Sequence, residues 1–131
     1  MVIDTSALAA IFFGEPERTT FLHAITAAAS RLISAASVLE TGIVLEGRQG
    51  ENAGREFDLF LVRANIEIVP VDREQADLAR SAWRKYGKGR HPAGLNFGDC
   101  FAYALAKRYG EPLLFKGNDF PQTDIEPALK R

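Results

Sequence analysis

Short apolar runs alternate along the chain with longer segments whose apolar residues recur every three or four positions. The short runs have the length of buried strands, and the periodic segments have the length of helices. We expect strands at residues 2–3, 31–34, 66–69 and 112–115, and helices at residues 7–13, 16–29, 38–46, 53–64, 72–86 and 97–108. This alternation predicts an α/β fold, a three-layer sandwich around a short-stranded, mainly parallel sheet.

Length and composition indicate one globular domain over residues 1–131, with 47% hydrophobic and 25% charged residues. No apolar run approaches the ~18 residues that cross a bilayer, and the start of the chain lacks the basic region of a signal peptide. The single cysteine, Cys100, has no internal disulfide partner and no nearby base, so we expect a buried thiol and not a nucleophile. We therefore expect a cytoplasmic protein without a membrane partner.

The net charge of −1 is unusual for a nucleic-acid-binding protein, which normally has a clear basic excess. If four carboxylates belong to a metal site, 16 basic residues face 13 remaining acidic ones, and the rest of the chain has a charge of +3. Net charge therefore excludes no class of function.

Four acidic residues fall near the ends of predicted strands or the starts of predicted helices. Asp4 follows the first strand, Glu40 lies early in the third helix, Asp99 lies in the first turn of the last helix, and Asp119 follows the last strand. Each has a local alternative role. Asp4 could be an N-cap, Glu40 the capping-box partner of Ser37, Asp99 a favourable charge on the helix dipole, and Asp119 a turn residue.

The predicted topology places these acids together. Right-handed crossovers between parallel strands bring the carboxyl ends of the strands to one edge, where ligands bind in open α/β sheets. Two carboxylates about 4 Å apart repel by roughly 4 kcal/mol at an effective dielectric near 20, so a cation would be needed among them. Hard oxygen ligands suit Mg²⁺ or Mn²⁺, which can promote phosphodiester hydrolysis.

Four segments extend this prediction: VIDTSA at residues 2–7, SVLE at 37–40, LNFGDC at 95–100 and LLFKGNDF at 113–120. In order and spacing they resemble the motifs of PIN-domain ribonucleases, above all the VapC-type toxins of bacterial toxin–antitoxin pairs. The resemblance implies a PIN-like nuclease domain over the whole chain and an Mg²⁺ site built around Asp4, Glu40 and Asp99. It also implies endonucleolytic cleavage of RNA and a cognate antitoxin as inhibitor.

The last motif departs from the family pattern. Many members have an acid two residues before the Asp-Phe pair, where this chain has Gly117, and Asn118 is neutral as well. Asp119 is then either a fourth catalytic carboxylate, beside Asp4, Glu40 and Asp99, or a residue that holds the loop.

Several neighbouring residues have two interpretations each. Thr5, Ser6 and Asn96 either orient the acids or cap helices. The basic stretch at residues 84–91 either holds RNA phosphates while Tyr86 stacks on a base, or is a solvated loop.

Two other function classes compete with a nuclease. A phosphate-signalling receiver domain is also a small α/β fold with an acid-bound Mg²⁺, and Lys116 after the last strand fits it. However, a receiver needs paired acids after its first strand, where Thr5 and Ser6 follow Asp4. A PIN-like interaction module without catalysis is the second alternative, because of the two neutral positions in the last motif.

An uninterrupted apolar run at residues 9–13, followed by Leu22 and Ile25, predicts a helix that is apolar nearly all round. Such a helix must be buried in the core or covered by another chain. Together with the family resemblance, this motivates the expectation of a homodimer and of an antitoxin that covers the acidic edge.

Overall fold

The computed structural model describes residues 1–130; position 131, the end of the expected domain, lies outside them. Four parallel strands form one sheet in the order β3-β2-β1-β4. The strands are β1 (Val2–Ile3), β2 (Leu32–Ser34), β3 (Glu67–Val69) and β4 (Leu113–Leu114). The helices are α1 (Thr5–Phe12), α2 (Arg18–Ala27), α3 (Ala35–Gln49), α4 (Glu51–Arg63), α5 (Arg73–Tyr86), α6 (Phe97–Tyr109) and the short 3-10 helix η1 (Phe120–Gln122).

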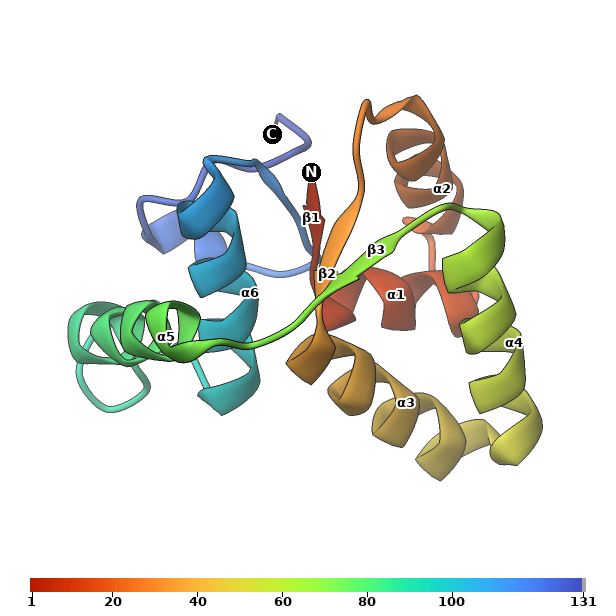
Figure 1. The fold of residues 1–131 in the computed structure, drawn as a ribbon, viewed down its shortest axis with the longest axis horizontal. Helices are drawn as coiled ribbons and strands as arrows, with labels where there is room; N and C mark the ends of the chain where they lie inside the picture. Colours follow the sequence, from red (N-terminus) through yellow and green to blue (C-terminus); the bar gives the residue numbers. More distant parts are fainter. Residues whose placement is uncertain (131) are drawn as a thin grey trace.

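The two faces of the sheet bury different side chains, because successive residues of a strand point to opposite faces. Val2 pairs in register with Leu113, and both pack into the core under α5 and α6. Ile3 pairs with Leu114, and both pack into the other core, with α1, α2 and α4. Figure 1 shows these two groups of helices on opposite sides of the strands, which confirms the predicted three-layer α/β sandwich.

The apolar run at residues 9–13 is covered by this chain itself. Ile11 is buried, and the Phe12 ring packs edge-on against Phe57 and Phe60 of α4, with centroids 6.0 and 5.5 Å apart. The run therefore does not require a partner chain, contrary to one motive for expecting one. Large apolar side chains are exposed elsewhere: Leu39 and Ile43 on α3, Leu59 and Val62 on α4, Trp83 on α5 and Phe97 on α6.

The connections from strand to helix are very short. Asp4 alone separates β1 from α1, and β2 passes directly into α3, whose N-cap Ser34 accepts a hydrogen bond from the Ala36 amide at 3.2 Å. Because α3 begins before Ser37, the expected capping box between Ser37 and Glu40 is wrong. Glu40 instead lies in the second turn of α3, near the strand ends.

Helix α5 begins as predicted, with Asp72 accepting a hydrogen bond from the Gln75 amide at 2.9 Å. The spacing of Ala76, Ala79, Trp83 and Tyr86 predicts that these four side chains face the core, and the buried face of α5 differs from that prediction. Ala79 is buried as expected, but Ala76 and Trp83 are exposed, and Gln75 is buried in their place. Small alanines make the close contact with α6, so the large indole lies beside that contact and not within it.

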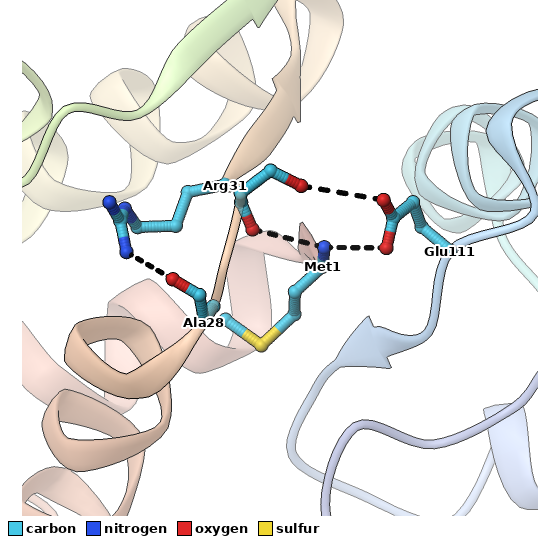
Figure 2. A network of polar contacts seen from close by, with 5 residues as sticks. Met1, Ala28, Arg31 and Glu111 are labelled. Atoms are coloured by element: carbon cyan, nitrogen blue, oxygen red, sulfur yellow. Dashed lines mark hydrogen bonds and ion pairs between the residues drawn. The ribbon is translucent and has the colours of Figure 1, made fainter.

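Polar contacts hold the start of β1 between its neighbours (Figure 2). The Met1 ammonium donates to the Ser30 carbonyl at 3.1 Å and to the Glu111 carboxylate at 2.9 Å, and this lowers the pKa of Glu111. Nearby, the Arg31 guanidinium donates to the Ala28 carbonyl at 2.8 Å, at the end of α2. These contacts lie at the opposite end of β1 from Asp4. Within residues 1–130, no helix has both the length and the apolarity to cross a bilayer.

Candidate active site

The four predicted acids lie around the carboxyl ends of the strands. Asp4 follows β1, Glu40 lies on the helix that continues β2, Asp119 lies in the loop after β4, and Asp99 is in the first turn of α6. The pKa of Asp99 is raised to about 7, mainly by burial; a hydrogen bond from the Asn96 backbone opposes this rise, and the charges of Asp4, Asp119 and Glu40 add to it. All three other carboxylates therefore lie within electrostatic reach of Asp99.

Asp4 is both a helix cap and a buried acid. Its Oδ2 accepts hydrogen bonds from the Ser6 amide at 3.0 Å and from the Ser6 hydroxyl at 2.6 Å. Only 3% of Asp4 is exposed, and burial raises its pKa from 3.8 to about 6; the Ser6 bonds oppose this rise and the Glu40 charge adds to it. Asp4 therefore caps α1, but capping alone does not explain why this buried position has an acid that is costly to ionise. Ser6 thus orients the Asp4 carboxylate.

Asp99 forms a reciprocal capping box with Asn96. The Asp99 amide donates to Asn96 Oδ1 at 2.9 Å, and Asp99 Oδ2 accepts from the Asn96 amide at 3.0 Å. This confirms Asn96 as the N-cap of α6, and it also fixes the direction of the Asp99 carboxylate.

Glu40 reaches from α3 to the start of α6. Its carboxylate lies against Gly98, so closely that a methyl group on Gly98 would overlap it. The glycine therefore makes a recess for the Glu40 carboxylate directly before Asp99.

Asp119 is exposed at the head of η1, and its side chain makes no capping hydrogen bond there. Its loop is attached to the Asp4 motif, because the Lys116 amide donates to the Ser6 hydroxyl at 2.9 Å. Gly117 has a φ of 116°, a conformation that favours glycine. Glycine therefore suits the backbone at this position, where many PIN domains have an acid.

The donor chemistry fits a divalent cation. All four side chains offer hard oxygen ligands, and the raised pKa values of Asp4 and Asp99 mean that positive charge would be favourable here. Within residues 1–130, no three His, Cys, Asp or Glu side chains are already gathered as a metal-binding group.

Buried hydroxyls resolve the role of Thr5. The Thr41 hydroxyl donates to Thr5 Oγ1 at 3.0 Å, and Thr5 Oγ1 donates to the Ser37 carbonyl at 3.4 Å. The Thr5 hydroxyl therefore joins α1 to α3, whereas the amide and hydroxyl of its neighbour Ser6 bind the Asp4 carboxylate.

Two other candidates lie outside the chemistry of this edge. Cys100 is buried, and burial followed by the Asp99 charge raises its pKa to about 11, so its thiol stays protonated near neutral pH. Lys116 forms ion pairs with Glu15 and, at 3.2 Å, with Glu17. Its ammonium is therefore directed to these acids, unlike the active-site lysine that the receiver alternative requires.

The basic stretch at residues 84–91 covers the end of α5 and the first part of an ordered loop between α5 and α6. The Lys88 amide donates to the Leu95 carbonyl and the Leu95 amide donates to the Tyr86 carbonyl, both at 2.9 Å. The half-buried Tyr86 ring packs edge-on against His91 at 5.1 Å and lies tilted against Tyr103 at 5.9 Å. These contacts favour a packing role for Tyr86 over stacking on a base. Two exposed aromatic residues lie near this loop, Trp83 and Phe97; the sequence marked neither as functional, and Trp83 was expected in the core.

Comparisons with known proteins agree with this architecture. Residues 1–126 match the PIN domain family. Ribonuclease VapC30 of Mycobacterium tuberculosis is 59% identical over 125 residues, which are 95% of each chain. The crystal structure of M. tuberculosis VapC20, described as a Sarcin-Ricin loop cleaving toxin, superposes with a TM-score of 0.72 at 22% identity and covers 96% of this chain and 98% of that one. A toxin–antitoxin complex from Klebsiella pneumoniae gives a TM-score of 0.69 at 18% identity, over 94% and 92% of the two chains.

The parallel sheet and the carboxylates at its edge define an α/β protein of the PIN class. The match over residues 1–126 and the 59% identity show that the chain belongs to the PIN-domain family, among the VapC ribonucleases. This confirms the resemblance seen in the four sequence motifs and rules out the receiver-domain alternative.

Proposed function

We propose that this chain is the RNA-cleaving toxin of a toxin–antitoxin pair and that it hydrolyses RNA phosphodiester bonds at Asp4, Glu40, Asp99 and Asp119. Relatives named VapC ribonucleases share up to 59% of its residues over nearly their whole length, which makes it an endoribonuclease. The charges of Asp4, Glu40 and Asp119 all add to the rise that burial causes in the pKa of Asp99. This observation supports the position of the site.

Enzymes of this family depend on a metal ion, and we assign Mg²⁺ or Mn²⁺ here. Asp4 and Asp99 would hold the ion directly, Glu40 directly or through water, and Asp119 would supply a fourth carboxylate. Such an ion lowers the pKa of water and offsets negative charge on the phosphate oxygens.

The residues of the chain itself keep this site ordered. The Ser6 hydroxyl and the Asn96 amide hold the carboxylates of Asp4 and Asp99. We assign water as the nucleophile, so that no covalent enzyme intermediate forms; Cys100 does not compete for this role, because its thiol is protonated and buried. Water oxygen bonds to phosphorus, the opposite P–O bond breaks, and the leaving oxygen takes a proton.

The inhibitor in this proposal is a small antitoxin that places an Arg or Lys towards Asp4 and Asp99. A cation from the antitoxin would neutralise the same carboxylates that the metal ion needs. Apolar antitoxin residues have a surface beside this edge, where Leu39 and Ile43 of α3 are 65% and 64% exposed and Glu40 lies between them in sequence. We also expect the toxin to form a homodimer.

Expression in a bacterial host tests the function. Induction of the wild-type chain should stop growth, Asp99→Asn should not, and co-expression of the reading frame immediately upstream should restore growth. Sizing of the co-purified material reports the partner and the oligomeric state. Normal growth on induction of soluble wild-type protein, with no small partner recovered, would contradict the toxin assignment.

A further inference from the structure

An open apolar groove of about 640 Å³ lies between α5 and α6, outside the group of four acids. Trp83, Leu95, Phe97 and Phe101 supply much of its lining. Asn96, which caps α6 and bonds to Asp99, lines the groove as well. The groove therefore opens directly beside the acidic edge, and its volume is in the range of small-molecule sites.

Its aromatic side chains are unusually accessible. Phe97 is 82% exposed and Trp83 is 46% exposed, and the Phe97 ring packs edge-on against Phe101 at 4.9 Å. Exposed aromatic side chains in a groove favour a ligand with a flat apolar surface.

The groove has a strongly basic rim. Residues 78–98 contain five Lys or Arg residues and no Asp or Glu; Asp77, directly before them, forms an ion pair with Arg80 at 3.9 Å. Lys88 and Arg80 line the groove, and the Arg90 guanidinium lies over the Trp83 indole at 4.6 Å. Arg90 is held there by a hydrogen bond from its Nε to the Arg84 carbonyl at 3.3 Å. Flat aromatic surfaces bordered by cations are the combination that binds single-stranded nucleic acid.

We propose that this groove binds an unpaired base of single-stranded RNA next to the cleavage site, with Trp83 and Phe97 in contact with the base and Lys88 and Arg80 beside its phosphates. This inference rests on the proposed function, because it assigns the groove to the RNA substrate. A second copy of the chain fits this face less well, since a two-fold interface would place identical basic rims against each other.

Trp83 is the only tryptophan in the chain, so its fluorescence reports on the groove directly. The protein is titrated in EDTA, which prevents metal-dependent cleavage, with a mixed-sequence single-stranded RNA of twelve nucleotides. A stacked base should quench the emission of Trp83. An abasic ribose-phosphate chain of the same length offers phosphates alone and should leave the emission unchanged.

Variants separate the aromatic contact from general charge, with anisotropy of fluorescein-labelled RNA as the measurement. Trp83→Ala or Phe97→Ala should weaken RNA binding about 5- to 150-fold, the loss expected for one stacked base. Trp83→Phe retains a flat ring and should recover most of the affinity. Tyr109→Ala is the matched control, because Tyr109 is 48% exposed on α6 with Arg108 over its ring at 5.2 Å, and it does not line the groove.

Several outcomes would overturn the inference. Equal quenching by the abasic chain, or equal RNA affinity of folded Phe97→Ala and wild type, would show that no base binds in the groove. The groove would instead belong to a second copy of the chain if two results were found together: the emission of Trp83 changes with protein concentration in the absence of RNA, and Phe97→Ala dissociates the dimer. Base-dependent quenching without any cleavage in Mg²⁺ or Mn²⁺ would contradict the proposed function but not RNA binding in the groove. Metal-dependent cleavage without quenching would contradict only RNA binding in the groove.

Discussion

The carboxylate of Glu40 lies directly against Gly98, one residue before Asp99. This contact brings an acid from α3 to the start of α6, although the two residues are far apart in the sequence. Position 98 must remain without a side chain for Glu40 to stay where it is. Gly98 is therefore a requirement of the site and not only of the helix.

Gly98→Ala should reduce RNA cleavage by about 100-fold, since small displacements of reacting groups have effects of that size. Stability should stay within about 1 kcal/mol of wild type or increase, because alanine favours helix and Glu40 is a flexible side chain that can move aside. Initial rates and urea unfolding give the two values. Gly47→Ala, at a helical glycine of α3 with open space around it, is the control and should keep full activity. Full activity of Gly98→Ala would show that the position of Glu40 does not matter for cleavage.

Metal binding should stabilise the folded protein. Mg²⁺ or Mn²⁺ at a hundredfold excess over its Kd should add about 2.7 kcal/mol to the free energy of unfolding, because it relieves repulsion among the carboxylates. Asp99→Asn should lose most of this response in thermal unfolding with and without metal. An equal response in wild type and Asp99→Asn would place the ion elsewhere.

Stability without metal should fall as the pH rises from about 4 to 7. The pKa values of Asp4 and Asp99 are raised from 3.8 to about 6 and about 7, so the folded state binds more protons than the unfolded state in that interval. The stabilisation is complete below pH 4 and is lost as each folded-state carboxyl ionises. Urea midpoints in EDTA measure this slope, and Asp4→Asn with Asp99→Asn should flatten it. Midpoints that rise through the same interval would contradict the burial of these acids.

Asp119→Asn should weaken metal binding and lower cleavage, with a smaller loss than Asp4→Asn. The reason is position: Asp119 is exposed and acts on Asp99 through its charge, whereas Asp4 is almost fully buried. The metal concentration that gives half-maximal cleavage reports the difference. Wild-type metal dependence of Asp119→Asn would make it a loop residue only.

Much of the fold could be predicted because local chemistry marks the ends of the elements. Helix α6 is an example, since Asn96 caps its start and Gly110, in a left-handed conformation, ends it as expected. The position of the four acids near one edge of the sheet also followed from the sequence, because parallel strands place their carboxyl ends together.

Other features depend on tertiary contacts that residue patterns do not reveal. Two serines could each have capped α3, and only the direct passage from β2 selects Ser34 over Ser37. The inward face of α5 was misjudged because its contact with α6 uses Ala79 and Ala82, which left Trp83 outside. The recess at Gly98 requires two distant helices to meet, so no local pattern predicts it.

Cleavage of RNA by the purified protein, before and after removal of metal, tests the central claim most directly. Wild type should cut single-stranded RNA in Mg²⁺ or Mn²⁺, stop in EDTA and recover when the ion is restored. Asp4→Asn should remain folded and inactive throughout, because the amide keeps the volume of the side chain but loses its charge. Cleavage that continues in EDTA, or that Asp4→Asn performs at the wild-type rate, would contradict a metal-dependent site at this edge of the sheet.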